Sequence, residues 1–154
     1  MSKQSKISYL FITFIFFTII DLYLSNYILK FGYKIPSNPV FDFVFIQNDG
    51  AAFNILQDCR GFLVAFAVVA VVGIFIYVIK NILRLKLIAI FFTSLLLAGI
   101  FCNLLERIYF GYVRDFIKIN FFNFPIFNIS DIFINLSVFA IIIIIIKNNY
   151  FKKI

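Results

Sequence analysis

The sequence of 154 residues contains no histidine and no tryptophan, only two cysteines, and few charged residues (14%). Without histidine the chain cannot build a Ser-His-Asp or Cys-His catalytic group, an HExxH zinc site, or the Ser-His pair of rhomboid-type membrane proteases. Its two cysteines, Cys59 and Cys102, provide neither a disulfide framework nor a metal-binding motif. Any proton transfer must therefore use carboxylates, lysine or tyrosine, and we expect no metal or other cofactor.

What is abundant is apolar: 64% of the residues are hydrophobic, and the mean hydropathy is +1.05. Four stretches are almost free of charge and have about the 20 residues that a helix needs to cross a bilayer; they cover residues 7–29, 61–79, 87–105 and 127–146. The first has no cleavage site after it and is too long for a signal peptide. We expect an all-α membrane protein of one domain, residues 1–154, with four transmembrane helices and both termini on one side.

The charges indicate the orientation. If the N-terminus is cytoplasmic, the inner segments hold eight of the fourteen basic residues, in the direction of the positive-inside rule. All seven acidic residues fall in the outer loops or at the outer ends of spans: Asp21, Asp42, Asp49, Asp58, Glu106, Asp115 and Asp131. The net charge of +7 therefore reflects topology and does not indicate a nucleic-acid partner.

The outer connections, about residues 30–60 and 106–126, are long enough to build a site. In "NPVFDFVFIQNDGAAFNIL" (38–56) apolar and polar residues alternate before the turn signal Asn48-Asp49-Gly50, after which "AAFNIL" could return as a second strand. The second connection alternates around Asp115, and Pro125 prevents the last helix from starting early. We expect a small extracytoplasmic β hairpin or sheet patch at the membrane surface.

Three of the four spans carry a polar stripe near the outer end. The stripes are Thr18, Asp21 and Ser25; Gly99, Asn103 and Arg107, with Glu106 beside them; and Asn128, Asp131 and Asn135. Within each stripe the three- and four-residue spacing puts the side chains on one helical face. Ionisable groups at such depth are costly and indicate function unless they are paired, so we expect the stripes to face one another.

Structural roles are possible for each of these residues. Residues 128–131 stand where a helix begins, and asparagine, serine and aspartate are favoured helix caps. Asp21 could pair with Arg107 across the bundle, Glu106 could form a local or interhelical pair, and Asp115 could be solvated in its loop. Cys102 fits a packing role.

Two of the acids have a stronger combined interpretation. Asp115 and Asp131 are 16 positions apart and flank a short loop that can return on itself, so they can meet at the membrane surface. Two carboxyl groups in a partly dry site share one proton, so that one acts as a base toward water and the other as an acid toward a carbonyl oxygen. Such a pair cleaves peptide bonds without histidine, a nucleophilic serine or a metal.

Several motifs resemble those of lipoprotein signal peptidase (signal peptidase II), a family of bacterial aspartic membrane proteases. They are Asp21 in the first span, "NDGAAF" (48–53), "AGIFCNLLER" (98–107), "VRDF" (113–116) and "FNISD" (127–131). The resemblance implies that Asp115 and Asp131 are catalytic. It also implies substrate-binding roles for Asp21, Asn48, Gly50, Asn103, Arg107 and Asn128.

The family's substrate is a prolipoprotein that carries a diacylglyceryl group on a cysteine, and cleavage occurs just before that cysteine. The resemblance further implies a monomer in the bacterial cytoplasmic (inner) membrane, surrounded by lipid, with cytoplasmic termini and an extracytoplasmic active site. It also implies inhibition by globomycin-type cyclic peptides.

The chain departs from the family pattern at several positions. Glu106 stands in place of aspartate, Ala98, Cys102 and Ser137 in place of glycine, and Ser130 in place of alanine. A small polytopic transporter or a non-catalytic membrane assembly protein is the alternative. A transporter, however, needs polar groups throughout the membrane depth, and a presenilin-like protease needs a GxGD motif, which the sequence lacks.

Overall fold

The computed structural model describes residues 1–51, 55–121 and 123–151. It contains four long helices, α1 (Lys3–Phe31), α2 (Arg60–Asn81), α3 (Leu87–Tyr109) and α4 (Ile129–Phe151), and all four are long and apolar enough to cross a membrane. A short 3-10 turn, η1 (Gly32–Lys34), and two strands, β1 (Phe41–Asn48) and β2 (Val113–Ile119), complete the fold. The expected four-helix membrane architecture is confirmed.

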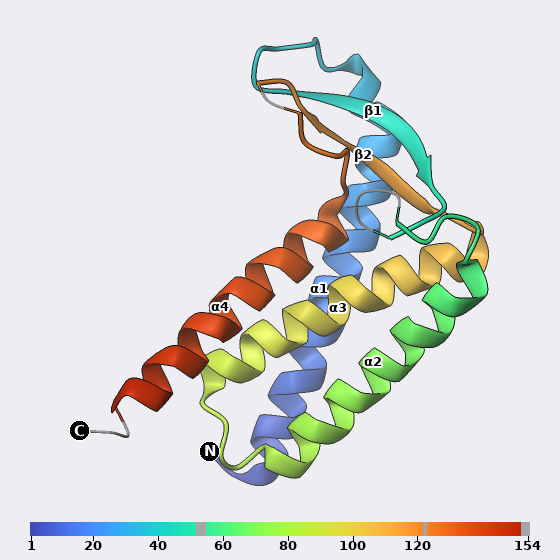
Figure 1. Cartoon of the computed structure of the whole chain (residues 1–154). Coiled ribbons are helices and arrows are strands. Elements are labelled where there is room, and N and C mark those ends of the chain that lie inside the picture. The colour runs from blue at the N-terminus through green and yellow to red at the C-terminus, as the bar shows by residue number, and fades with distance from the viewer. Residues whose placement is uncertain (52–54, 122, 152–154) are drawn as a thin grey trace.

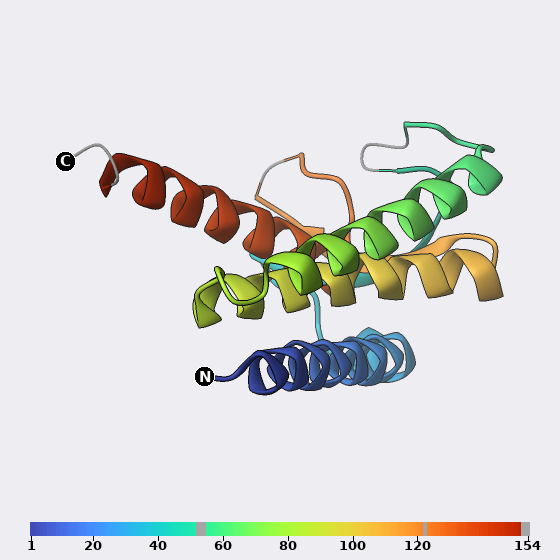
Figure 2. The same cartoon turned by 90° about the horizontal axis from the view of Figure 1, so that it is seen from below.

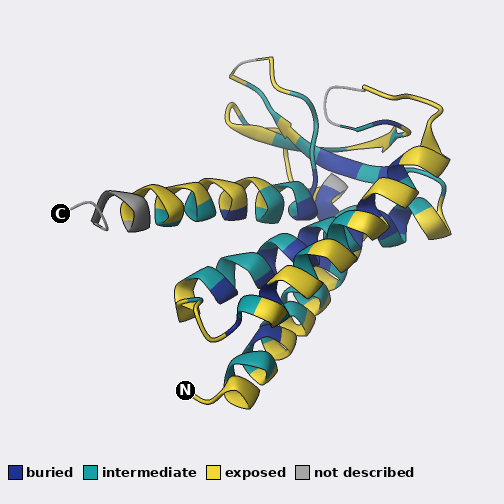
Figure 3. Ribbon diagram, turned by 60° about the horizontal axis from the view of Figure 1, so that its bottom comes forward, coloured by how far each residue is buried: buried dark blue, intermediate teal, exposed yellow. Residues whose placement is uncertain are grey.

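Helix α3 is the central helix and packs against α1, α2 and α4 (Figure 1; Figure 2). Of its most apolar 18-residue window 44% is buried, whereas the value is 11–17% for the other three helices. Figure 3 shows the remaining helix faces largely exposed, as expected for surfaces that meet lipid. The sheet covers one end of the bundle, and α1 begins and α4 ends at the other (Figure 1).

The contact between α3 and α4 depends on Gly99. A Cβ atom at this position would lie 2.6 Å from the backbone oxygen of Ser130 and 2.9 Å from Cγ1 of Ile134. Only glycine allows the first turn of α4 to approach α3 this closely. The polar ends of the two helices are thereby brought together.

The sheet patch is confirmed, but its pairing differs from the expected hairpin. Strand β1 pairs antiparallel with β2, from Phe41 opposite Ile119 to Asn48 opposite Val113, with an irregularity between Phe43 and Ile46. Residues 52–54 of "AAFNIL", the segment expected to return as a second strand, lie outside the described part of the chain; within the described residues the partner of β1 is β2. The turn signal does end β1: directly after the strand the Asn48 side chain accepts the Gly50 backbone N–H at 3.0 Å, and the Ala51 N–H donates to the Ile55 carbonyl at 2.7 Å.

The chain reverses on both sides of β2. Between α3 and β2 it passes through Gly111, whose φ of +92° favours glycine. After β2 it folds back along the strand, so that the backbone of Phe127 exchanges two hydrogen bonds with Ile117, at 2.8 and 3.1 Å. Helix α4 starts only after Pro125, as expected, and its first turn therefore lies beside β2.

Candidate active site

A cavity of about 800 Å³ lies where the sheet meets the ends of α3 and α4. The two strands, both helices and residues 124–127 contribute to its walls. Its polar lining residues are Asn48, Asn103, Arg107, Asp115, Asp131 and Asn135. Both aspartates of the predicted pair thus line one cavity, and the polar stripes of α3 and α4 face each other across it.

Asp115, in the middle of β2, is buried, with a relative exposure of 3%. Its carboxylate accepts one hydrogen bond from Nδ2 of Asn48 at 2.8 Å and another from Nδ2 of Asn128 at 3.0 Å. Burial raises the pKa of Asp115 to about 7, and the nearby Asp131 adds to this, while the hydrogen bond from Asn48 and the charge of Arg107 oppose it. A solvated role for Asp115 is wrong, because this carboxyl group is held in a dry, charged site.

Asp131 has two roles at the start of α4. The Asn128 side chain accepts the Asp131 backbone N–H at 2.9 Å, and the Asp131 carboxylate accepts the Asn128 backbone N–H at 3.2 Å. This reciprocal pair is a capping box. The other carboxylate oxygen accepts Nδ2 of Asn103 from α3 at 3.0 Å. A single side chain therefore takes part in capping the helix and also lines the cavity.

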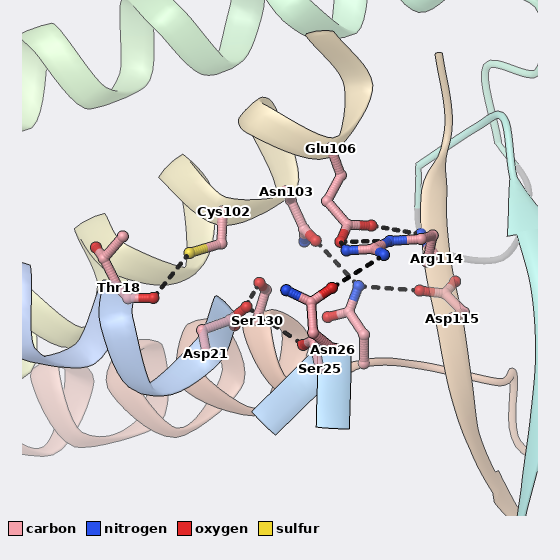
Figure 4. A network of polar contacts seen from close by, with 11 residues as sticks. Thr18, Asp21, Ser25, Asn26, Cys102, Asn103, Glu106, Arg114, Asp115 and Ser130 are labelled. Carbon is pink, nitrogen blue, oxygen red and sulfur yellow. Dashed lines mark hydrogen bonds and ion pairs between the residues drawn. The ribbon is translucent and has the colours of Figure 1, made fainter. Parts of the chain in front are cut away.

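Two asparagine amides connect the aspartates. Nδ2 of Asn128 donates both to Asp115 and to Oδ1 of Asn103, each at 3.0 Å, and Asn103 in turn donates to Asp131. Figure 4 shows Asn103 and Asp115 within this network. Each amide uses its acceptor and its donors in a fixed direction, so the network orients both carboxylates relative to each other.

The turn after β1 is fixed against the same site. Oδ1 of Asn48 accepts the Gly50 backbone N–H at 3.0 Å, and the Gly50 carbonyl accepts Nη2 of Arg107 at 2.7 Å. Nη1 of Arg107 also donates to the Asn103 carbonyl at 3.3 Å. Arg107 therefore holds the turn over the cavity and places a positive charge beside the two carboxylates.

Asp21 is buried but is not among the residues that line the cavity. It accepts the Ser130 hydroxyl at 2.6 Å and the Ser25 hydroxyl at 3.4 Å (Figure 4). The considered ion pair with Arg107 is wrong, because Asp21 is bonded to these serines and Arg107 to backbone carbonyls. Asp21 reaches the site indirectly, through the residue that precedes Asp131.

Glu106 pairs with Arg114, the residue before Asp115, and not with its own neighbour Arg107. One carboxylate oxygen accepts Nε of Arg114 at 2.9 Å and Nη2 at 2.5 Å, and the other accepts the Arg114 backbone N–H at 2.7 Å. Glu106 forms an ion pair as expected, but its partner lies on β2 and is neither a neighbour on α3 nor a residue of another helix. This contact fixes the start of β2 against α3 and thereby the position of Asp115, the next residue on the strand.

The other departures from the family pattern lie within the packing. Cys102 is buried against α1, with its Sγ 4.0 Å from the Thr18 carbonyl (Figure 4). Ser137 is fully buried, and its hydroxyl has no hydrogen-bond partner among the described residues. Neither residue lines the cavity.

The sequence did not indicate the apolar walls of the cavity. Ile46, Val113 and residues 124–127 contribute to them. The strand alternation around Ile46 and Val113 was visible, but which strand would pair with which was not. In the sequence, Pro125 indicated only a late start of α4.

The model of the signal peptidase (SPase) II family matches residues 12–147. The chain belongs to this family. It is 36% identical to the lipoprotein signal peptidase of Buchnera aphidicola subsp. Schizaphis graminum, over 97% of this chain and 99% of that protein. It is also 36% identical to the lipoprotein signal peptidase of Clostridium tetani, over 73% of each chain.

A solved bacterial membrane enzyme has a similar fold, with a TM-score of 0.78, 28% identity, and coverage of 91% of this chain and 88% of that one. The resemblance inferred from the motifs is thus confirmed. Signal peptidase II is a bacterial membrane protease, and the four apolar helices of this chain agree with that class.

Proposed function

We propose that this chain is an aspartic endopeptidase that removes the signal peptide from diacylglyceryl-modified prolipoproteins and cleaves just before the lipidated cysteine. Asp115 and Asp131 are its catalytic pair. The observation that carries the proposal is the position of these two carboxyl groups: they come from different elements, line one cavity and are oriented by one asparagine, Asn128. The relatives named above are lipoprotein signal peptidases, which supports the same substrate.

The chemistry follows from one shared proton. The ionised carboxylate removes a proton from a water molecule, and the water oxygen attacks the scissile carbonyl carbon while the other carboxyl group protonates the carbonyl oxygen. The resulting tetrahedral diol collapses when its C–N bond breaks and the leaving amine takes a proton. The raised pKa of Asp115, about 7, keeps this proton available at neutral pH.

The remaining polar groups position the substrate and the catalytic pair. We assign Asn48, Gly50, Asn103, Arg107 and Asn128 to binding or ordering the peptide around the cavity, and Asp21 to supporting the start of α4 from behind. The cavity is lined by exposed apolar side chains such as Ile46 and Phe124. Next to lipid, these would keep the acyl chains of the substrate in the bilayer while the scissile bond reaches the aspartates.

The proposed topology places the chain in the bacterial cytoplasmic membrane, with both termini in the cytoplasm and the cavity at the extracytoplasmic face. The distribution of charge supports this orientation. We further propose that the chain acts as a monomer and that globomycin-type cyclic peptides inhibit it by occupying the same cavity.

The alternatives, a small transporter or a non-catalytic assembly protein, are not favoured by the comparisons. The polar cavity residues also gather at one end of the bundle, on the two strands, the last turns of α3 and the first turns of α4, rather than along a path through it.

The test is a gel-shift cleavage assay with the purified full chain and a diacylglyceryl-modified prolipoprotein. Asp115→Asn and Asp131→Asn should each reduce the cleavage rate at least about 1,000-fold, because each removes one half of the proton-sharing pair. Asp42→Asn is the matched control. Asp42 lies on β1 of the same sheet, is half-buried and does not line the cavity, so this change should leave the rate as it is.

Circular dichroism and thermal unfolding would show that the inactive variants are folded. Cleavage that persists in both aspartate variants would remove the pair from catalysis. Cleavage of the unlipidated precursor at the same rate would refute the proposed role of the diacylglyceryl group.

A further inference from the structure

A second cavity lies at the other end of the bundle, away from the carboxylates. Its volume is about 430 Å³, and it is formed by the last turns of α2, the first turns of α3 and the C-terminal half of α4. The walls are mainly aliphatic, with Ile74, Val78, Leu96 and Ile141 among them, and Tyr77, Arg84 and Lys86 also line it. Its size falls within the range of small-molecule sites, roughly 300–1,000 Å³.

Arg84, at the rim of this cavity, has no acidic residue near it in the sequence. All seven acidic side chains belong to the outer loops or the outer ends of helices, and residues 59–105, which form α2, the following turn and most of α3, contain none. Within the described residues, the Arg84 side chain has neither a hydrogen-bond nor an ion-pair partner. The charge of Arg84 is therefore available to an anion from outside the chain.

The turn that carries Arg84 is fixed in place. Nζ of Lys6, from α1, donates to the carbonyls of Ile82, Leu83 and Leu85, at 3.2, 3.2 and 2.6 Å. Lys6 is thus occupied by the backbone on both sides of Arg84. It orders the turn and leaves the Arg84 side chain exposed beside the cavity.

The positive-inside rule alone would place basic residues at this end of the bundle, wherever their side chains point. The arrangement here is more specific, because Arg84 and Lys86 line an aliphatic cavity. Lys80, which is exposed at the same end, does not line it. A basic rim on an aliphatic groove between transmembrane helices matches the two halves of an anionic lipid.

We propose that this cavity binds an anionic phospholipid, with the headgroup phosphate between Arg84 and Lys86 and one acyl chain along the aliphatic walls. The site is separate from the carboxylate cavity and does not depend on the protease activity. A zwitterionic lipid offers the same acyl chains without net charge and should bind more weakly.

The experiment is native mass spectrometry of the full chain in detergent, titrated with phosphatidylglycerol or with phosphatidylcholine of the same acyl chains. The wild type should bind phosphatidylglycerol more tightly. Arg84→Gln with Lys86→Gln should weaken this binding roughly fivefold for each cation removed. Lys80→Gln, the matched control, should leave it within twofold.

A second variant tests the apolar half of the site. Ala89 lines the cavity, and Ala89→Leu would fill part of it without changing the charge. This variant should also weaken phosphatidylglycerol binding, and soluble glycerophosphate should not compete. Circular dichroism and the cleavage assay check that these variants are folded.

Three results would overturn the proposal: equal affinity of the wild type for both lipids, an equal loss in Lys80→Gln, or full competition by glycerophosphate. A dimer that forms without lipid and is abolished by Ala89→Leu would instead assign the cavity to a second copy of the chain. If the wild type fails to cleave prolipoprotein but still distinguishes the two lipids, the proposed function fails and the lipid site stands.

Discussion

Polar side chains form different kinds of hydrogen bonds at the two ends of the helix bundle. At the inner end, polar side chains bond mainly to backbone carbonyls: Ser94 to Ile90 at 2.9 Å, and Lys6 to the turn after α2. At the outer end, side chains bond to side chains of other elements, as Asn128 does to Asp115 and Asn103. A side chain bonded to a carbonyl of its own helix, as Ser94 is, tolerates small movements of neighbouring helices. The outer network requires that three elements keep their relative positions.

The largest difference between the ends is expected for glycine substitutions. Gly99→Ala would place a methyl group 2.6 Å from the Ser130 backbone oxygen, so the first turn of α4 must move. Overpacking of this kind costs about 1–3 kcal/mol, and a displacement of about 1 Å at the catalytic pair reduces the rate on the order of 100-fold. The measurements are the cleavage rate and the unfolding temperature in detergent.

Gly73→Ala is the matched control, because a Cβ atom at Gly73 meets nothing within 4 Å. This change should leave the rate unchanged and the helix as stable or slightly more stable. Equal effects of the two substitutions would show that the close approach at Gly99 does not position the site.

The same contrast explains which features could be predicted from the sequence. The four helices could be, because hydropathy is a local property, although α1 and α3 extend past the apolar stretches to Phe31 and Tyr109. The helical spacing correctly placed Asn103 and Arg107 on one face. The motifs confirm the family, and the proposed catalytic assignment rests on it.

Partner choice across elements could not be predicted. The signal after Asn48 indicated a turn, but only the fold determines that β1 pairs with β2. Likewise, the sequence offers several possible partners for each charged residue. Glu106 binds Arg114 because β2 begins beside it, and Asp21 accepts a hydrogen bond from Ser130 because the first turn of α4 lies next to Asp21. Such choices depend on contacts between distant segments, about which local patterns carry no information.

A second prediction separates the capping role of Asn128 from its role in the site. Asn128→Ser keeps a favoured N-cap residue but removes the Nδ2 donor to Asp115 and Asn103. Loss of a hydrogen bond to a charged group costs about 1.5–3 kcal/mol, so the cleavage rate should fall roughly 10- to 150-fold. The unfolding temperature should fall as well, because the same hydrogen bonds stabilise the fold.

Asn128→Ala removes the cap as well, and should cost about 1 kcal/mol of stability in addition. If Asn128→Ser retained full activity, the amide network would not orient the aspartates and Asn128 would be a cap only.

The third prediction concerns pH. The folded-state pKa of Asp115, about 7, lies above its ordinary value of 3.8, so the folded chain holds this proton more tightly than the unfolded chain. The associated stabilisation is complete below about pH 3.8 and is lost as the pH rises through 7. Since catalysis needs one proton on the pair, kcat/KM should fall above about pH 7.

Two further variants test whether Asp115 determines this fall in kcat/KM at alkaline pH. Asn48→Ala removes a hydrogen bond that lowers the pKa of Asp115, so the alkaline limb should move to higher pH. Asp42→Asn, near the other end of β1 and outside the cavity, should leave the limb in place. A pH–rate profile of each variant is the measurement, and an alkaline limb that is identical in Asn48→Ala would assign it to another group.

The smallest expected effects compare two buried serines on α4. The Ser130 hydroxyl donates to Asp21 at 2.6 Å, so Ser130→Ala leaves that buried carboxylate without its shortest hydrogen bond and should cost about 1–3 kcal/mol. Ser137 is equally buried, but its hydroxyl has no partner within the described part of the chain. Ser137→Ala should therefore be neutral or stabilising.

Unfolding of both variants in detergent measures the difference. Ser130→Ala combined with Asp21→Asn should cost less than the sum of the two single changes, because both remove the same contact. If the two effects simply add, Asp21 does not act through Ser130, and its connection to the start of α4 must run by another contact. If Ser137→Ala is as destabilising as Ser130→Ala, the hydroxyl of Ser137 has a hydrogen-bond partner in the membrane. The difference between the two ends of the bundle would then not extend along α4.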